Sequence, residues 1–433
     1  MSPDPTLDPT LTSWVRVPKR SPFPIQALPY GVFSRTGEPP RVGVAIGDHI
    51  LDLAVLSDAG LVSLPGHLSM GMFDRPNLDR FLTAGRSAWT AVRRRVSGLL
   101  SVQNSEILDA GLAARAVIPL SAVDLHVPFT VADYVDFYSS IEHATNLGRM
   151  FRPDADPLLP NWRHLPVGYH GRAGTVVAGG TPIVRPSGQF RRPDQPPAHG
   201  PTGKLDIEVE LGFVIGTGSD LGTTVPTSKA ADHIFGVVLV NDWSARDIQA
   251  WEYQPLGPFL GKSFATSIGH WVTPLEALGP YRVEQPMQNP QPLPYLRVDE
   301  PWAFDLDFDV TLSTQVMRGR GDPPVRISLV NFSRMYWTMP QQLAHATING
   351  ASLRTGDLFA SGTISGSEAG SFGSLIELTW NGERPIDLPG GETRSFLEDG
   401  DEVTIIGRAG DGFRVPMIGL GEVTGRVLSA RSR

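Results

Sequence analysis

The sequence contains no cysteine among its 433 residues. Disulfide bonds, zinc sites with thiolate ligands and a cysteine nucleophile are therefore all excluded. Positive charge is also scarce, because 37 Lys and Arg stand against 45 Asp and Glu, giving a formal net charge of −8. A general nucleic-acid-binding protein would show a basic stripe or patch, so this composition argues against a nucleic-acid partner.

Long hydrophobic runs are missing as well. No segment approaches the roughly 20 apolar residues that cross a bilayer. The first residues carry prolines and aspartates where a signal peptide would have an apolar core. We therefore expect a soluble, cytoplasmic protein with no membrane partner.

Glycine and proline are plentiful, with 46 and 39 residues, which favours turns and short strands over long helices. The length exceeds the usual size of a single hydrophobic core, so two domains are expected. Short apolar runs around the Gly47-Asp48 turn predict a small β-barrel near the N-terminus. A helical pattern follows from Asn77 to about Leu112, and its basic cluster Arg93-Arg94-Arg95 is expected to form a solvated helix face.

The stretch from Val237 to Lys262 has the character of a functional site. Val237–Val240 predicts a buried strand that stops abruptly at Asn241-Asp242. Strand ends and the loops after them are where scaffolds present chemistry. Further functional side chains follow closely, namely Arg246, Gln249, Tyr253 and Lys262.

A second strand, from Leu205 to Ile215, places Glu208 and Glu210 on one face. Their Cα atoms are expected about 6.5–7 Å apart with parallel side chains. Two interpretations stay open: a solvated strand face, or a divalent cation that offsets the repulsion. Asp136 and Asp242 border similar segments, which favours the cation, and oxygen ligands point to Ca²⁺ or Mg²⁺.

Histidines offer candidates for acid–base chemistry. A helix is expected to begin after Ser139-Ser140, which places His143 in its first turn, close to Asp136 and Tyr138. His164 and His170 compete for the same role, and spacing does not choose among the three. A structural histidine also remains an alternative.

The sequence lacks the common nucleotide-binding motifs and the serine-hydrolase motif. The run LGPFLGKS ends like a phosphate-binding loop, but Leu256 replaces its first glycine and Pro258 removes a backbone N–H. The glycines after Ile215 have the wrong spacing for a dinucleotide fingerprint. No G-x-S-x-G element supplies a serine nucleophile elbow.

Several long blocks, in order, resemble the fumarylacetoacetate hydrolase family. They include FPIQALPYGVFS, DFYSS-x-x-HATN, LPNW-x-HLPVGYHGRA, NDWSARDIQ-x-WEY, PLGPFLGKSF and ASGTISG. The resemblance runs from about Phe23 to Val427 and implies a β-rich α+β fold. In that fold a small N-terminal SH3-like β-barrel, with a helical extension and linker, occupies residues 1–128. A larger C-terminal mixed β-roll, the catalytic domain, occupies 129–433 and forms a homodimer.

The resemblance also implies roles for individual residues. His143 matches the general base, and Glu377, in a predicted strand SLIEL, matches the carboxylate that orients it. Arg246, Gln249 and Lys262 match groups around the developing oxyanion and the leaving group. Metal-binding positions correspond to Asp136, Glu208, Glu210 and Asp242, with Lys262 and Thr266 at a second cation. Substrate-contacting positions correspond to Tyr138, Arg152, Tyr169, Gln249, Tyr253 and Thr363.

The reaction that the family resemblance implies is hydrolysis of a carbon–carbon bond in a 1,3-diketo acid. The substrate would be fumarylacetoacetate, cleaved to fumarate and acetoacetate as the last step of tyrosine and phenylalanine degradation, with Ca²⁺ or Mg²⁺ bound. Two alternatives stay open. One is a related hydrolase or decarboxylase acting on another diketo acid, and the other is a non-catalytic binding protein stabilised by a cation.

Overall fold

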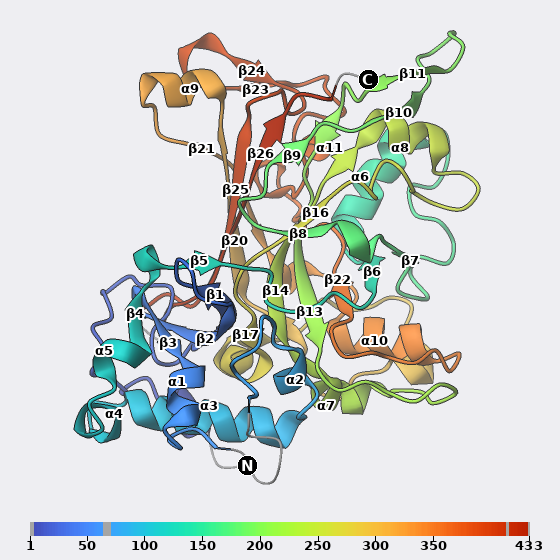
Figure 1. Cartoon of the computed structure of the whole chain (residues 1–433). Helices are drawn as coiled ribbons and strands as arrows, with labels where there is room; N and C mark the ends of the chain where they lie inside the picture. Colours follow the sequence, from blue (N-terminus) through green and yellow to red (C-terminus); the bar gives the residue numbers. More distant parts are fainter. Residues whose placement is uncertain (1–3, 64–70, 413–414, 432–433) are drawn as a thin grey trace.

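The largest sheet of the computed structural model, which describes residues 4–63, 71–412 and 415–431, has eight strands (Figure 1). Seven follow the order β7-β6-β22-β13-β14-β16-β8, and β17 pairs with β14. The pairs β6–β22 and β8–β16 are parallel and the others are antiparallel. The strands are β6 (Tyr134–Phe137), β7 (Gly168–His170), β8 (Val176–Ala178), β13 (Val209–Ile215), β14 (Ile234–Asp242), β16 (Thr266–Ile268), β17 (Thr273–Pro274) and β22 (Leu358–Ala360).

Strand β14 is buried along its whole length. Its side chains alternate between two hydrophobic cores, with Val237 and Leu239 in one and Val238 and Val240 in the other. Because successive side chains point to opposite faces, a strand covered on both faces needs an apolar residue at every position. Burying each such side chain contributes about 1.5–3 kcal/mol. The predicted buried strand is therefore confirmed, and the covering layers explain its uninterrupted apolar run.

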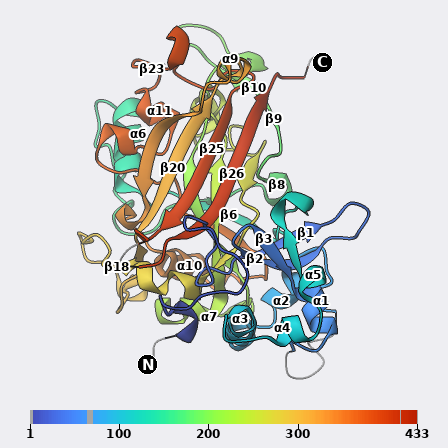
Figure 2. The same cartoon turned by 90° about the vertical axis from the view of Figure 1, so that its left-hand side faces the viewer.

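The first core lies between the eight-stranded sheet and a five-stranded sheet of order β21-β20-β25-β26-β9. Figure 2 shows the long strands of this second sheet side by side. Phe213 and Leu239 from the first sheet join Phe308, Ile405 and Val423 from the second. The strands are β9 (Ile183–Val184), β20 (Leu306–Ser313), β21 (Val325–Asn331), β25 (Glu402–Ala409) and β26 (Ile418–Leu428).

The second core joins the N-terminal region to the opposite face of the eight-stranded sheet. An antiparallel sheet of order β4-β3-β2-β1-β5 forms here, drawn in blue and teal at the lower left of Figure 1. Gly47, with φ +59°, turns the chain between β2 and β3 as predicted. The strands are β1 (Tyr30–Ser34), β2 (Arg41–Ile46), β3 (His49–Asp52), β4 (Val117–Pro119) and β5 (Asp124–Leu125).

The predicted helical region is divided into several helices, because Gly85 takes a positive φ of 83° immediately before α3. The helices of the N-terminal region are α1 (Leu53–Asp58), α2 (Asp79–Leu82), α3 (Arg86–Leu100), α4 (Glu106–Asp109) and α5 (Ala113–Ala116). The expectation of a solvated basic face is wrong for Arg93, which is 1% exposed. Its guanidinium donates to the Thr6 hydroxyl and to the carbonyls of Gln26 and Ala27. Helical spacing places Arg93 on the face of Trp89 and Val96, which is the buried one.

Short elements complete the described part of the chain. Pro340 is the second residue of helix α10 and is accommodated in its first turn, where no intrahelical N–H bond is needed. The helices are α6 (Ile141–Phe151), α7 (Ala230–His233), α8 (Arg246–Glu252), α9 (Gln315–Arg320), α10 (Met339–Thr347) and α11 (Leu375–Leu378). The two-stranded sheets pair β10 (Ser187–Phe190) with β11 (Ala198–Pro201), β12 (Leu205–Asp206) with β15 (Ser244–Ala245), β18 (Arg282–Val283) with β19 (Ala303–Phe304), and β23 (Ile386–Asp387) with β24 (Thr393–Arg394). Within the described residues, no helix combines the length and the apolar character that a membrane span requires.

Candidate active site

Four carboxylates meet at one end of the eight-stranded sheet, where β22 lies between β6 and the pair β13–β14. Asp136 lies on β6, Glu210 on β13 and Asp242 at the end of β14, while Glu208 directly precedes β13. Their candidate ligand atoms all lie within 4.8 Å of one another, and each residue is at most 5% exposed. The solvated strand face is therefore wrong for Glu208 and Glu210, since both side chains are buried. The predicted strand from Leu205 to Ile215 is interrupted at Ile207 and Glu208, between β12 and β13.

Two of these carboxylates lack the partners that a buried charge needs. Burial, reinforced by the neighbouring carboxylates, raises the pKa of Asp136 and of Glu210 well above the ordinary range. Within the described residues, Asp136 Oδ1 and Glu210 Oε1 have no hydrogen-bond partner. Unpaired buried carboxylate oxygens are costly unless a cation offsets them. The four residues therefore fit a divalent cation, and their all-oxygen ligand set suits a hard one.

Glu208 has a different environment from Glu210, although two positions separate them. Its Oε2 accepts a hydrogen bond from Lys262 Nζ, and its Oε1 lies 2.8 Å from Arg246 Nη1. Burial alone would raise the pKa of Glu208, but the charges of Lys262, Arg246 and His143 lower it to about 2. Glu208 is therefore ionised at neutral pH and ties the two basic side chains to the carboxylate cluster.

Lys262 connects Glu208 to Asp242. Its Nζ lies 2.7 Å from Asp242 Oδ2, and Thr266 Oγ1 donates to Asp242 Oδ1 at 2.7 Å. Burial would lower the pKa of Lys262, but the two carboxylates raise it above its ordinary value. A protonated ammonium donates and has no lone pair for a cation. A second cation at Lys262 would need the backbone carbonyl oxygen of this residue as its ligand. The binding of a second cation by Lys262 and Thr266 therefore stays a prediction.

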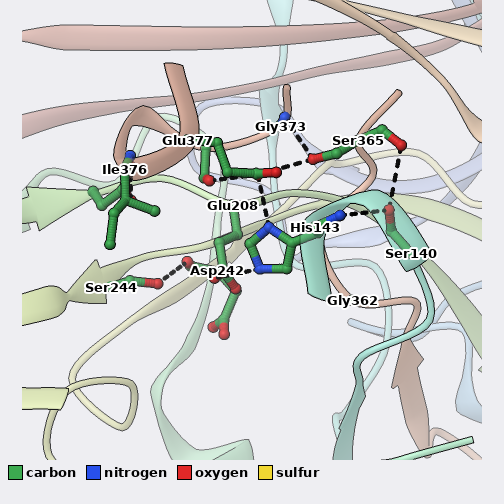
Figure 3. A network of polar contacts seen from close by, with 12 residues as sticks. Ser140, His143, Glu208, Asp242, Ser244, Gly362, Ser365, Gly373, Ile376 and Glu377 are labelled. Atoms are coloured by element: carbon green, nitrogen blue, oxygen red, sulfur yellow. Dashed lines mark hydrogen bonds and ion pairs between the residues drawn. The ribbon is translucent and has the colours of Figure 1, made fainter. Parts of the chain in front are cut away.

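The structure distinguishes among the three candidate histidines. His143 is 1% exposed and lies in the first turn of α6. Its backbone N–H donates to Oγ of the N-cap residue Ser140 at 3.2 Å. Its Nδ1 lies 2.7 Å from Glu377 Oε2, and its Nε2 lies 3.7 Å from Glu208 Oε1 (Figure 3). His164 and His170 are exposed. Only His143 of the three combines burial with a carboxylate on each ring nitrogen.

Glu377 lies on helix α11, so the predicted strand SLIEL is wrong. The short run is a single helical turn after Ser374, where apolar periodicity cannot separate a helix from a strand. Its Oε1 accepts a hydrogen bond from Asn146 Nδ2 at 3.0 Å. Its Oε2 accepts from Ser365 Oγ at 2.9 Å and from Ser374 Oγ at 2.8 Å. Burial raises the pKa of Glu377, but His143 and these donors outweigh burial and lower it.

The three donors to Glu377 were missed by the sequence reasoning. Asn146 follows His143 by three positions on α6, so both side chains lie on one face of that helix. This spacing was a usable signal. Ser365 and Ser374 carry no comparable signal, because their loops reach Glu377 only through the tertiary fold.

A cavity of about 390 Å³ opens beside the carboxylate cluster. All six predicted substrate-contacting residues line it, together with His143, Lys262, Asp136 and Glu208; the six are Tyr138, Arg152, Tyr169, Gln249, Tyr253 and Thr363. Within the described residues, Thr363 Oγ1 and Arg152 Nε have no hydrogen-bond partner. Arg246 and Glu377 are not among the lining residues, but they contact two that are, Gln249 and His143. Thr266 does not line the cavity either and contacts Asp242.

Two family models match almost the whole chain. Residues 26–128 match the model for the fumarylacetoacetase N-terminal region, and residues 134–428 match the model for the fumarylacetoacetate (FAA) hydrolase C-terminal region. Fumarylacetoacetase of Homo sapiens is 51% identical over 430 residues, covering 96% of this chain and 99% of that protein. The protein of the same name from Oryza sativa subsp. japonica is 46% identical over 427 residues, covering 97% and 98%.

A solved structure shares the fold at lower identity. Fumarylacetoacetate hydrolase from psychrophilic Exiguobacterium antarcticum has a TM-score of 0.51 and 16% identity to this chain. The match covers 93% of this chain and all of that one. The architecture described above is thus found in a protein whose sequence has diverged widely.

Proposed function

The chain belongs to the fumarylacetoacetate hydrolase family, and we propose that it hydrolyses fumarylacetoacetate to fumarate and acetoacetate in tyrosine and phenylalanine catabolism. The observation that carries this proposal is the buried pair His143–Glu377 beside four convergent carboxylates at a cavity. Full-length similarity to fumarylacetoacetases of animals and plants supports the same substrate.

A divalent cation is the cofactor, and we propose that Asp136, Glu208, Glu210 and Asp242 bind it as Ca²⁺ or Mg²⁺. When bound, such an ion acts as a Lewis acid that polarises the carbonyl oxygens of a 1,3-diketone. The unpaired oxygens of Asp136 and Glu210 support this assignment. Calcium and magnesium differ in the cavity size and flexibility that they require, so metal titration distinguishes them.

His143 is the proposed general base. Its Nδ1–H donates to Glu377, which leaves the Nε2 lone pair available to take a proton from water. A positioned base of this kind contributes about 10²- to 10⁴-fold in rate. The resulting hydroxide adds to the carbonyl carbon, and the adjacent carbon–carbon bond then breaks with its electron pair leaving as the enolate of acetoacetate. His143 returns its proton to the carbon of that enolate. No covalent enzyme intermediate is needed, consistent with the absence of cysteine from the sequence.

Arg246, Gln249 and Lys262 are proposed to meet the negative charge that develops on oxygen. Lys262 lines the cavity directly, so its ammonium can stabilise the enolate of the departing acetoacetate. Arg246 Nη1 lies 3.2 Å from Gln249 Oε1, which turns the amide N–H₂ of Gln249 away from the guanidinium. Arg246 thereby orients a donor that itself lines the cavity.

The walls of the cavity suit an anionic substrate with several oxygen acceptors. Arg152 offers a charge for a carboxylate, and its Nη2 is held by the Pro157 carbonyl at 2.8 Å. Tyr138, Tyr169, Tyr253 and Thr363 offer hydroxyl donors around the same space. We propose these five side chains and Gln249 as the substrate contacts.

The larger organisation is proposed from the family resemblance. Residues 1–128 form an SH3-like barrel with a helical extension, and residues 129–433 form the catalytic β-roll through which two copies assemble as a homodimer. Light scattering on the purified protein measures that assembly. A cytoplasmic location is likewise a proposal drawn from the sequence.

Turnover measurements test the proposed function. Purified protein with Mg²⁺ or Ca²⁺ is expected to hydrolyse fumarylacetoacetate in preference to acylpyruvates, and a clear preference for acylpyruvates would overturn the substrate. His143→Ala is expected to fold and to lose activity by orders of magnitude. Full activity in that variant would remove His143 from its role.

A further inference from the structure

Asp206, at the end of β12, is fully buried and lies between two parts of the candidate active site. Its Oδ2 accepts a hydrogen bond from Arg246 Nε at 2.7 Å and another from the backbone N–H of Ile376 at 3.0 Å. Its Oδ1 accepts from the backbone N–H of Leu375 at 2.7 Å and from its neighbour Ile207 at 2.7 Å. Both carboxylate oxygens are thus fully used by the protein, and none of these contacts involves the cavity.

Two of those contacts fix the backbone of α11. Leu375 and Ile376 are the first two residues of this one-turn helix, and Glu377 follows directly. The first N–H groups of a helix have no intrahelical acceptor, so an external carboxylate determines where the turn sits. Ile376 and Glu377 are drawn in Figure 3, where α11 carries Glu377 toward His143. Asp206 therefore determines the position of the residue that orients the proposed base.

The other contact fixes Arg246. Its Nε is held by Asp206, while its Nη1 is held by Glu208 and Gln249. Arg246 is 2% exposed, so its guanidinium position is set by these acceptors and not by solvent. The same carboxylate thus joins the end of β12, which leads to Glu208 and Glu210, with the start of α8 and the start of α11.

We propose that Asp206 is a positioning residue for the hydrolysis. It holds Glu377, and with it His143, at a fixed distance from Arg246. This inference rests on the proposed function of the site. Catalysis depends on such geometry steeply, because a misplacement of about 1 Å can cost about 100-fold in rate. Asp206 is not among the residues that line the cavity, and its hydrogen bonds described above go to none of the proposed cation ligands, so it acts through the groups that it holds.

Asp206→Asn is the first test, since it keeps the shape but replaces one acceptor oxygen with a donor. We expect kcat to fall about 10- to 100-fold, with KM for fumarylacetoacetate changed less than about threefold and the fold retained by circular dichroism. An unchanged kcat would overturn the proposal. Turnover by the wild type tests the proposed function, whereas the ratio of variant to wild-type kcat tests the role of Asp206. Failure of the proposed function is therefore distinguishable from failure of the proposal for Asp206.

Asp52 provides a matched control in the N-terminal region. It is also fully buried, accepts from Arg41 Nε at 2.7 Å, and caps α1 through the N–H groups of Ala54 and Val55 at 3.0 and 3.2 Å. Asp52→Asn is expected to lower the melting temperature as much as Asp206→Asn while kcat at 25 °C stays within twofold. An equal loss of kcat in both variants would show that Asp206 contributes only stability.

Asp206→Glu keeps the charge opposite Arg246 but lengthens the side chain by one methylene group. It remains informative if the Asn variant fails to fold, because the guanidinium keeps a counter-ion. If the position of the carboxylate matters, kcat of Asp206→Glu stays at least tenfold below that of the wild type. A kcat equal to that of the wild type would show that the charge alone suffices. In Asp206→Asn/Glu377→Gln, the loss is expected to be at least threefold smaller than the product of the single losses. Multiplicative losses would overturn action through Glu377.

Discussion

His143 Nδ1 lies 2.7 Å from Glu377 Oε2, although the two residues are 234 positions apart in the chain. The contact is closed to solvent, since both residues are 1% exposed. A carboxylate that accepts from Nδ1–H fixes the imidazole tautomer and orientation. The proposed base is therefore assembled by packing α11 against α6, and neither helix carries the function alone.

Glu377→Gln tests that assembly. The amide keeps the size of the side chain but can present N–H₂ to Nδ1, which favours the wrong tautomer. We expect kcat to fall about 10²- to 10⁴-fold with little change in KM. Steady-state kinetics with fumarylacetoacetate measures this, and Glu402→Gln, which alters a surface ion pair with Arg426, should keep wild-type kcat. Wild-type kcat in Glu377→Gln would show that the contact is dispensable.

Glu210→Gln should act in opposite directions with and without cation. In metal-free protein it removes a buried carboxylate whose pKa is raised by burial and by Asp136, so the melting temperature should rise. A gain of about 1 kcal/mol corresponds to roughly 2–4 °C or less for a protein of this size. Addition of Mg²⁺ or Ca²⁺ should stabilise the wild type but leave Glu210→Gln almost unchanged. Thermal unfolding scans with chelator and with added cation measure both effects. Equal cation-induced shifts in the melting temperature of the two proteins would contradict cation binding by Glu210.

Chelation should abolish turnover reversibly. When all are ionised, the six buried carboxylates of the described site carry more charge than Lys262 and Arg246; the six are Asp136, Glu208, Glu210, Asp242, Asp206 and Glu377. A divalent cation offsets part of that excess, so the treated protein should lose both activity and stability. Activity assays before and after dialysis against a chelator, followed by cation addition, measure this. Full activity after complete metal removal, verified by elemental analysis, would remove the cation from the reaction.

Arg93→Met should destabilise the N-terminal region. The substitution leaves the carbonyls of Gln26 and Ala27 without their donors, at a cost of about 1–3 kcal/mol for each buried group that stays unpaired. Arg94→Met removes the same charge from an exposed neighbour and should change stability by less than about 0.5 kcal/mol. Urea unfolding followed by fluorescence compares the two. Equal midpoints would show that the buried guanidinium contributes nothing.

Asp357 should make stability depend on pH. Burial, with a smaller effect of Asp133, raises the pKa of this carboxyl to about 6 from an ordinary value of 3.8. The folded state therefore holds the proton more tightly, so this contribution is fully present below about pH 4 and is lost as pH rises through 6. With partial solvent screening we expect a loss of about 1–2 kcal/mol. Unfolding free energies of the wild type and of Asp357→Asn are measured at pH 4, 6 and 8. The difference between the two proteins should change by this amount from pH 4 to pH 8, and parallel pH profiles would contradict the assignment.

Much of the architecture near the site follows from local sequence patterns. The apolar run Val237–Val240 identified a strand covered on both faces, and its two cores confirm this. Ser140 before His143 identified the start of α6. These features depend on side-chain alternation and on helix capping, which involve neighbours within a few positions.

The sequence by itself determined the residue types for the chemistry, the buried strands that present them and the family to which they belong. Only the tertiary structure selected His143 over His164 and His170, placed Glu377 on a helix, buried Arg93 and brought Asp206 against α11. Each of these depends on contacts between segments far apart in the chain. Local periodicity reports which side of an element is apolar, whereas burial of a polar group is decided by the distant partner that accepts or donates its hydrogen bonds.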